Sequence, residues 1–207
     1  KILISNLLNA NLMDLVEINV HDNSDRDIQN LNKLTCADVN YFPNLSNVGY
    51  GGNVRACIKN AKGQYLHIVS DDDTYNFSAI GSVLKSLSKE KCGALALTCS
   101  LSTDTNIKFN TLLNSFDCDQ MKLGEVLDST EVVTPFNLLP SIITETALMK
   151  KGERLFHEGD NDYMHAMIFF MGADRATRVI FDNSGLVVTY NVPEAIQGCF
   201  GLSKLLT

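Results

Sequence analysis

Three consecutive carboxylates, Asp71, Asp72 and Asp73, are the strongest indication of a functional site in this sequence. They follow Tyr65–Val69, a mostly apolar stretch that predicts a buried strand. Open α/β sheets bind ligands at the carboxyl ends of their strands, which is where these carboxylates fall. Like charges this close repel one another unless a cation neutralises them, and carboxylate oxygens suit Mg²⁺ or Mn²⁺. The alternative interpretation is a solvated acidic loop that caps the next helix.

A glycine-rich segment, Asn47–Gly52, precedes a helix predicted from about Asn53 to Ala61. With Asp71 about twenty residues further on, this segment partly matches the dinucleotide-binding fingerprint, in which a carboxylate binds a ribose. Val54 stands at the third glycine position, however, and Pro43–Asn47 separates the segment from the preceding strand. An oxidoreductase with a dinucleotide-binding Rossmann-like fold is therefore kept as an alternative.

Strands and helices that alternate along the chain must position these residues. Glu17–Val20, Val39–Phe42 and Ala94–Cys99 predict further short strands. Helices are predicted over the first dozen residues, after Ser78, at Leu123–Leu127 and at Met164–Met171. Two further strands, paired around a turn, are predicted at Arg178–Phe181 and Gly185–Tyr190. Strands separated by helical stretches imply crossover connections, so we predict one α/β domain over residues 1–207 with a largely parallel sheet.

Charge and composition exclude several classes of protein. The 207 residues carry a formal net charge of −7, which argues against a nucleic-acid surface, since that needs a basic stripe. No apolar run approaches the ~20 residues of a membrane span, and we expect a cytosolic protein. The 6 cysteines form no CxxC pair, which favours reduced, mostly buried thiols.

Three segments, in this order, resemble family 2 glycosyltransferases of the GT-A fold. They are EINVHDNSD at Glu17–Asp25, NVGYGGNVRACIKNAKGQYLHIVSDDD at Asn47–Asp73, and EGDNDY at Glu158–Tyr163. The resemblance covers most of Glu17–Tyr190. The residues of its motifs are similar to those of bacterial transferases that build lipopolysaccharide and capsule. It implies an enzyme of the hexosyltransferase type that moves a sugar, with inversion, from a nucleotide-diphosphate donor to a saccharide or lipid-linked acceptor hydroxyl. Acceptors of this class imply a cytoplasmic protein with possible peripheral association at the inner face of the membrane.

The first part of the chain carries the residues that the resemblance assigns to the donor. Asp22 matches the acidic residue that reads the nucleotide base. Asn47, Gly49 and Asn53 match the loop and helix start that line the nucleotide-sugar site. We therefore expect residues 1–100 to form the donor half and residues 101–207 the acceptor half. Arg55, in the first turn of the predicted helix, is either a phosphate contact or a surface arginine.

The acidic triplet takes its role from the same resemblance. Asp71 and Asp73 match the DxD pair that contacts the ribose and the Mn²⁺ or Mg²⁺ ion held by the diphosphate. Asp72 can exchange roles with Asp71, because the family often writes the motif as D-x-D-D. Such a metal stabilises the negative charge that grows on the leaving diphosphate.

The second acidic segment matches the catalytic base of the family. A carboxylate must take the proton of the acceptor hydroxyl as it attacks the anomeric carbon. Asp160 or Asp162 matches that base, and Glu158 is a weaker third candidate. The alternative is that this acidic run caps the apolar helix that follows, since carboxylates stabilise a helix N-terminus.

One departure from the family pattern concerns the beginning of the domain. The family starts with an apolar strand that packs against the nucleotide, and residues 1–16 resemble the helix that follows that strand. We therefore expect the first strand to precede Lys1 in a longer protein. Without it, a GT-A-like module that binds sugar but does not transfer it is a further alternative.

Overall fold

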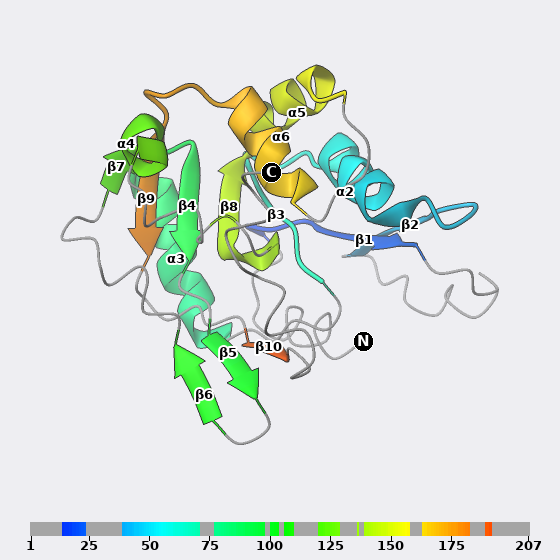
Figure 1. The fold of residues 1–207 in the computed structure, drawn as a ribbon. Coiled ribbons are helices and arrows are strands. Elements are labelled where there is room, and N and C mark those ends of the chain that lie inside the picture. Colours follow the sequence, from blue (N-terminus) through cyan, green and yellow to red (C-terminus); the bar gives the residue numbers. More distant parts are fainter. Residues whose placement is uncertain are drawn as a thin grey trace.

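The computed structural model describes residues 14–23, 39–70, 77–97, 100–103, 106–109, 120–128, 136, 139–157, 163–182 and 189–191. Helices pack around a central sheet in these residues (Figure 1). In chain order they are β1 (Ile18–Asp22), β2 (Val39–Pro43), α2 (Gly49–Asn60), β3 (Tyr65–His67), α3 (Phe77–Lys89), β4 (Ala94–Leu97), β5 (Ser100–Thr103), β6 (Asn106–Phe109), β7 (Gln120–Lys122), α4 (Leu123–Asp128), a 3-10 turn (Leu139–Ser141), β8 (Ile142–Glu145), α5 (Thr146–Leu155), α6 (Met164–Gly172), β9 (Arg178–Asp182) and β10 (Thr189–Asn191). The predicted N-terminal helix lies outside the described residues.

The α/β class is confirmed, but the central sheet is mixed rather than mostly parallel. Its order is β3-β8-β4-β9-β7, and among these described strands the parallel pair is β4–β9. A parallel neighbour requires a crossover connection. The 3-10 turn instead leads directly into β8, which runs antiparallel to both β3 and β4.

Two smaller sheets complete the described strands. β1 and β2 pair in parallel, and β5 pairs with β6 and with β10. The predicted hairpin between Arg178–Phe181 and Gly185–Tyr190 is wrong, because β10 pairs with β5 and not with β9. The neighbours of β9 are β4 and β7, so both of its edges already hold a partner.

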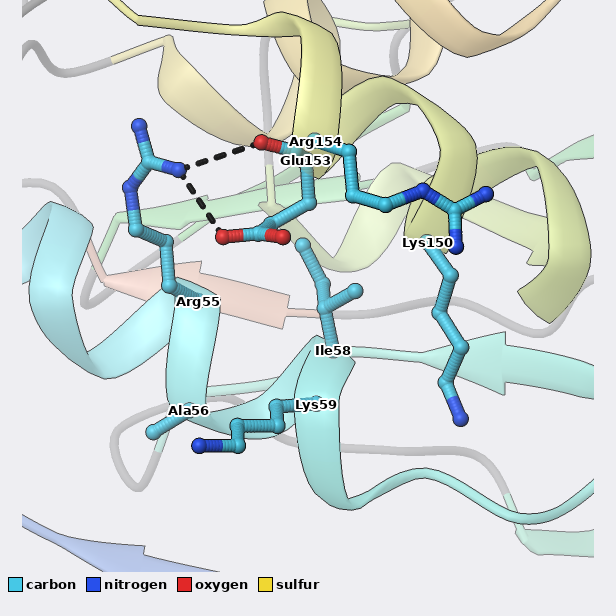
Figure 2. A pocket seen from close by; sticks show the side chains of 7 residues that line it. All are labelled: Arg55, Ala56, Ile58, Lys59, Lys150, Glu153 and Arg154. Atoms are coloured by element: carbon cyan, nitrogen blue, oxygen red, sulfur yellow. Dashed lines mark hydrogen bonds and ion pairs between the residues drawn. The ribbon is translucent and has the colours of Figure 1, made fainter.

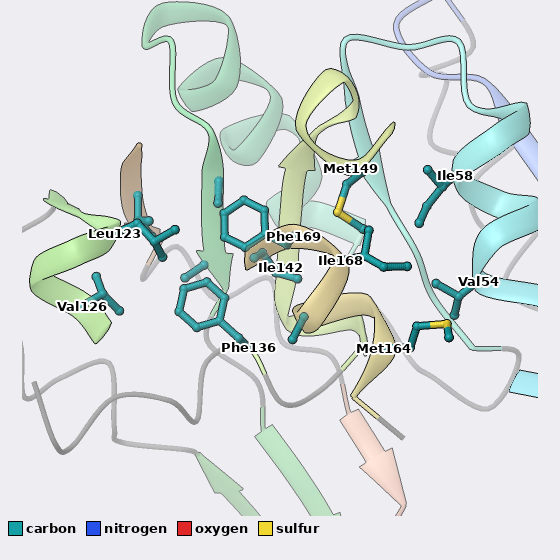
Figure 3. Close-up of a cluster of buried hydrophobic side chains, with 14 of the residues drawn as sticks. Val54, Ile58, Leu123, Val126, Phe136, Ile142, Met149, Met164, Ile168 and Phe169 are labelled. Carbon is teal, nitrogen blue, oxygen red and sulfur yellow. The ribbon is translucent and has the colours of Figure 1, made fainter. Parts of the chain in front are cut away.

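Helices cover both faces of the central sheet, and β4 shows why. Its side chains alternate between the faces, as in any strand. Ala94 and Ala96 face the larger core cluster, with α2, α5 and α6, whereas Leu95 and Leu97 pack with α3 in the smaller one. Because both faces are buried, β4 consists entirely of apolar residues. Figure 3 shows the larger cluster, in which the ring of Phe136 stacks on that of Phe169 from α6.

Helices α5 and α6 meet backbone to backbone. A Cβ atom added at Gly152 would lie 1.8 Å from the carbonyl oxygen of Ile168, and one at Gly172 would lie 1.9 Å from that of Leu148. Contacts this short leave no room for any side chain at either position. The two glycines therefore set the distance between the helices.

A buried histidine joins α2 to α6. His165 is only 3% exposed, and its Nε2 lies 3.0 Å from the carbonyl oxygen of Phe136. Because a carbonyl oxygen only accepts, Nε2 carries the proton, and Nδ1 accepts the hydroxyl of Tyr50 at 2.8 Å. Burial lowers the pKa of His165 to about 4, so the neutral ring is the stable form.

The structure tests the expectations for cysteines and for membrane spans only within the described residues. Cys57 is half-buried and Cys92 is buried, both as free thiols, and burial raises the pKa of each. The other cysteines lie outside the described residues. Within the described ranges, no helix has the length and apolar character needed to cross a bilayer.

The glycine contact predicts that Gly152→Ala destabilises the fold. We expect a loss of at least about 1–3 kcal/mol, the usual cost of overpacking, because a backbone carbonyl and not a flexible side chain stands in the way. Gly81→Ala is the matched control, since nothing lies within 4 Å of a Cβ there and its helix is α3. That change should instead add about 0.5–1 kcal/mol, and urea unfolding measures both. Equal stability of the two variants would contradict the close packing of α5 on α6.

The neutral His165 predicts a loss of stability in acid. The unfolded chain takes up a proton near pH 6.5, whereas the folded ring does so only near pH 4, so protonation favours unfolding between these values. We expect this residue to reduce the free energy of unfolding by about 2–3 kcal/mol between pH 7 and about pH 4.5. Urea unfolding of the wild type and of His165→Gln, which does not titrate, measures the difference. A loss of the same size in both proteins would show that other groups cause it.

Candidate functional site

The predicted donor residues begin at the carboxyl ends of β1 and β2. Asp22 ends β1 and is paired in the register with Pro43 of β2. Its Oδ2 accepts a hydrogen bond of 2.6 Å from the hydroxyl of Tyr41, and its carbonyl oxygen accepts one of 2.9 Å from the backbone N–H of Asn44. These bonds hold Asp22 at the strand end, half-buried, in a fixed orientation.

The Asp22 carboxylate changes the chemistry of its neighbour. Burial and the adjacent negative charge raise the pKa of Tyr41 to about 12. The phenol therefore remains protonated at neutral pH and continues to donate to Asp22. On the residue before Asp22, the ring of His21 stacks on Phe42 with 4.9 Å between centroids, and burial lowers its pKa.

The side chain of Asn23 ties the strand ends to the start of α2. Its Oδ1 accepts the backbone N–H of Val48 at 2.8 Å and the Nδ2 of Asn44 at 3.1 Å. Its Nδ2 donates to the Oδ1 of Asn47 at 3.0 Å and to the carbonyl oxygen of Gly49 at 3.1 Å. A single amide thus orients the whole segment from Asn44 to Gly49.

Gly49 is the point at which that segment turns into a helix. Its φ of 74° lies in the left-handed region, which a residue with a side chain rarely adopts. The Oδ1 of Asn47 accepts the N–H of Gly49 at 2.9 Å, which is an Asx turn. Since these contacts already bind the N–H groups of residues 48 and 49, α2 begins at Gly49 and not near Asn53 as predicted.

Asn53 lies one turn into α2 and joins the same network. Its Oδ1 accepts the Nδ2 of Asn44 at 3.2 Å. Asn44 thereby uses both of its amide hydrogens, one on Asn23 and one on Asn53. The structure therefore brings Asn47, Gly49 and Asn53 together beside the end of β1, where Asp22 stands.

Arg55 does not point toward this site. Its guanidinium donates to the carbonyl oxygens of Glu153 (3.3 Å) and Phe156 (2.9 Å), pairs with the Glu153 carboxylate at 3.0 Å, and lies over the Phe156 ring. Phe156 is the C-cap residue of α5. The arginine therefore binds the end of α5. It is neither a phosphate contact at the donor site nor a surface arginine without contacts.

The predicted metal ligands and bases, Asp71, Asp72, Asp73, Asp160 and Asp162, lie outside the described residues, and so does Glu158. The structure places only the elements next to them. β3 and Ile68–Ser70 lead toward the triplet, and α6 begins at Met164, just after the second acidic segment. Among the residues that the structure describes, no group of three or more histidines, cysteines or carboxylates is arranged to hold a metal ion.

Sequence reasoning missed Asn23, Asn44 and Tyr41. Asn23 belongs to a dense turn cluster after a predicted strand, and Asn44 follows the proline that closes the next strand. Polar residues directly after two neighbouring parallel strands are a signal for a shared site, because such strand ends meet at one edge. That signal was available for both asparagines. The contact between Tyr41 and Asp22 spans two strands and required their register.

Comparison with solved structures shows the fold. The chain is similar to residues 1–349 of S. aureus TarS in complex with UDP-GlcNAc, with a TM-score of 0.66 and 18% identity over 92% of this chain and 55% of that one. Two further structures of the same TarS residues, the second in complex with UDP, give TM-scores of 0.64 and 0.63, each with 18% identity over 91% of this chain and 56% of the other. The chain thus spans about half the length of these structures.

The family follows from the sequence comparison. No curated protein sequence matches the chain. The family model for glycosyl transferase family 2, however, matches residues 2–204, which is nearly the whole chain. With the GT-A fold and the strand-end arrangement described above, this match shows that the chain belongs to glycosyl transferase family 2.

Proposed function

We propose that this chain is the catalytic domain of a glycosyltransferase that moves a sugar from a nucleotide-diphosphate donor to an acceptor hydroxyl. The observation that carries the proposal is the network centred on Asn23, in a member of glycosyl transferase family 2. It gathers Asp22, Asn47 and Asn53, which match donor-binding positions of the family, at one end of β1. Its hydrogen bonds hold the donor-binding surface in shape before a ligand arrives.

The donor in this proposal is a nucleotide-diphosphate sugar, and UDP-GlcNAc is the first to test. Support comes from TarS, whose structures contain UDP and UDP-GlcNAc. The α2 helix adds support of another kind. Its first turn carries no acidic residue, and a helix N-terminus bears partial positive charge that favours an anionic ligand.

We assign the divalent cation to Asp71 and Asp73, with Asp72 able to replace Asp71. The oxygen ligands of these residues suit Mn²⁺ or Mg²⁺, and such an ion supplies positive charge opposite the leaving diphosphate. Glu17 links the segments that precede β1 and β3. Its Oε1 accepts the backbone N–H groups of Lys62 at 2.6 Å and Gly63 at 2.9 Å, so the segments that lead into β1 and β3 start side by side.

We assign the catalytic base to Asp160 or Asp162. The base takes the proton of the acceptor hydroxyl, the hydroxyl oxygen bonds to the anomeric carbon, and the bond to the nucleoside diphosphate breaks. A single displacement of this kind inverts the anomeric centre. The other aspartate is available to stabilise the N-terminus of α6, which starts at Met164 without a side-chain cap.

The acceptor is a saccharide or a lipid-linked saccharide of a bacterial surface polysaccharide, such as lipopolysaccharide. This part of the proposal rests on the wording of the Asn47–Asp73 segment, which is similar to transferases of that class. It places the reaction in the cytoplasm, at the inner face of the membrane.

The Rossmann-type oxidoreductase is less well supported. Its fingerprint requires a glycine-rich loop that leaves a strand end and crosses a dinucleotide pyrophosphate. Here Asn44–Val48 separates β2 from α2, and Gly51 and Gly52 lie inside the helix. The family match argues the same way.

The proposal predicts that a nucleotide-diphosphate sugar stabilises the chain only when Mn²⁺ or Mg²⁺ is present. We expect a rise in Tm on the order of 5 °C at a donor concentration of about 100 Kd, because ligand that binds only the folded state adds about 2.7 kcal/mol. Thermal shift with UDP-, GDP-, CMP- and dTDP-sugars, with and without Mn²⁺, measures it. Stabilisation by a nicotinamide dinucleotide and by none of these sugars would support the oxidoreductase instead.

Two matched variants connect that shift to the asparagine network. Asn44→Asp keeps the size of the side chain but removes both donors, to Asn23 and Asn53, and should weaken donor binding about tenfold or more. Asn40→Asp removes a similar bond, from Asn40 Nδ2 to Asn19 Oδ1 at 2.9 Å, in the middle of the strands. It should leave donor affinity within about twofold. Equal effects of the two changes on donor affinity would show that the asparagine network does not support the donor site.

The base assignment predicts a loss of turnover without a loss of donor binding. Either Asp160→Asn or Asp162→Asn should reduce kcat by about 10²–10⁴-fold, the usual contribution of a general base, while the donor-induced thermal shift is unchanged. Sugar transfer and donor hydrolysis by the purified protein measure the change. If neither variant loses activity, the base lies elsewhere, and if the wild type binds donor without turnover, the chain is a sugar-binding module.

A further inference from the structure

A cationic pocket lies between α2 and α5, apart from the donor residues. It has a volume of about 450 Å³, and its lining includes Arg55, Lys59, Lys150 and Arg154 against one carboxylate, that of Glu153 (Figure 2). The chain as a whole carries a net charge of −7, so this concentration of positive charge runs against the average of the molecule.

The two helices run antiparallel along the pocket, and this direction decides which cations are already engaged. Arg55 of α2 binds Glu153 and the carbonyl oxygen of Phe156 at the end of α5. Lys150 of α5 donates to the carbonyl oxygen of Ala61, just past the end of α2, at 2.7 Å. Each helix therefore neutralises the carbonyl groups at the end of the other.

Lys59 and Arg154 differ from these two cations. Both side chains are exposed, and neither has a hydrogen-bond or ion-pair partner among the described residues. Arg55 already neutralises Glu153, and Arg55 and Lys150 already bind the carbonyl groups at the helix ends. No other anionic or carbonyl group among the described residues of the pocket is therefore left to bind Lys59 or Arg154. Together with Lys150 they leave a net positive charge for an external anion.

The shape of the pocket favours a small ligand that is both anionic and partly apolar. Ala56, which is half-buried, and the methylene groups of Lys59 and Lys150 provide the apolar part of the lining (Figure 2). A pocket of this volume is of the size that holds small molecules. The carbon face of a sugar ring fits against an aliphatic side chain, and a phosphate or carboxylate on that ring fits between Lys59 and Arg154.

The pocket lies apart from the donor network. At about 100° per residue, Arg55 and Lys59 lie on the opposite side of α2 from Asn53, which belongs to that network. A ligand in this pocket therefore does not occupy the donor site.

We infer that this pocket binds an anionic saccharide, a sugar carrying a phosphate or a carboxylate, at a site separate from the donor. The inference goes beyond the proposed transferase function. Lys59 and Arg154 bind the charged group, and Ala56 with the methylene groups of the neighbouring cations contacts the sugar.

The test titrates the full chain with glucose 6-phosphate, and with glucose and inorganic phosphate as separate probes, followed by backbone amide NMR. We expect glucose 6-phosphate to shift resonances of α2 and α5 and to bind at least tenfold more tightly than either other probe. The double variant Lys59→Glu/Arg154→Glu should lose at least tenfold in that affinity. Lys85→Glu/Lys89→Glu on α3 has the same net charge and should bind as the wild type does.

Each contrary result has a definite meaning. Equal losses of affinity in the two double variants would show that only the net charge of the protein matters, and would overturn the inference. Binding of glucose or of inorganic phosphate as tightly as glucose 6-phosphate would overturn it as well. Vesicles of anionic phospholipid provide the remaining probe. If they bind through Lys59 and Arg154 while glucose 6-phosphate does not, the surface contacts a membrane and the saccharide pocket is wrong.

Donor binding separates this inference from the proposed function. The Lys59→Glu/Arg154→Glu protein should keep the thermal shift caused by a nucleotide-diphosphate sugar, because neither residue belongs to the donor network. If the donor shift is present and glucose 6-phosphate does not bind, the pocket inference alone fails. If glucose 6-phosphate binds through Lys59 and Arg154 but no nucleotide sugar binds, the proposed function fails and the pocket remains an anionic saccharide site.

Discussion

The hydrogen bonds of the Asn23 side chain determine where α2 begins, and much of the structure depends on that point. The carboxamide bonds two backbone groups and two other asparagines, so it holds the segment after β2 against the end of β1. A carboxylate or a hydroxyl at this position lacks the donor and acceptor combination that these contacts need. Since α2 starts with a left-handed glycine and no side-chain cap, these bonds also replace the cap that most helices carry.

From that start, α2 connects the two regions to which the predicted chemistry belongs. One side of the helix holds Asn53 against the strand ends, and the other holds Arg55 against the end of α5. Helix α5 in turn meets α6 at Gly152 and Gly172 with backbone in contact with backbone. Helix α2 is therefore connected through α5 to α6, and in the sequence the segment of the proposed base lies between α5 and α6.

The distribution of charge follows from the same packing. Antiparallel α2 and α5 place cations of one helix at the carbonyl end of the other, which stabilises both ends. Arg55 and Lys150 satisfy this need, so Lys59 and Arg154 have no structural task among the described contacts. Their charge is the physical basis for a pocket that attracts an anion on a protein that is acidic overall.

Local patterns in the sequence were sufficient for the class of fold and for most elements near the donor site. The strands that end at Asp22 and Pro43, the helix that contains Val54 and Ile58, and the buried strand at Ala94–Leu97 all follow from short-range periodicity. Helix α5 could not be predicted in this way, because its buried positions are Thr146, Met149 and Gly152, which form no apolar stripe.

Contacts between segments that are distant in the sequence could not be predicted without the folded structure. Periodicity reports which side of an element is buried but not which element covers it, so the partner of β10 and the mixed sheet could not be read from the chain. The same limit applies to Asn23 and Asn44, which are 21 residues apart, and to Arg55, which is 98 residues from Glu153. The family, the motifs and the candidate residues follow from the order of the amino acids alone. The packing of α2 determined which of them meet, because hydrogen bonds between side chains depend on positions that only the folded backbone sets.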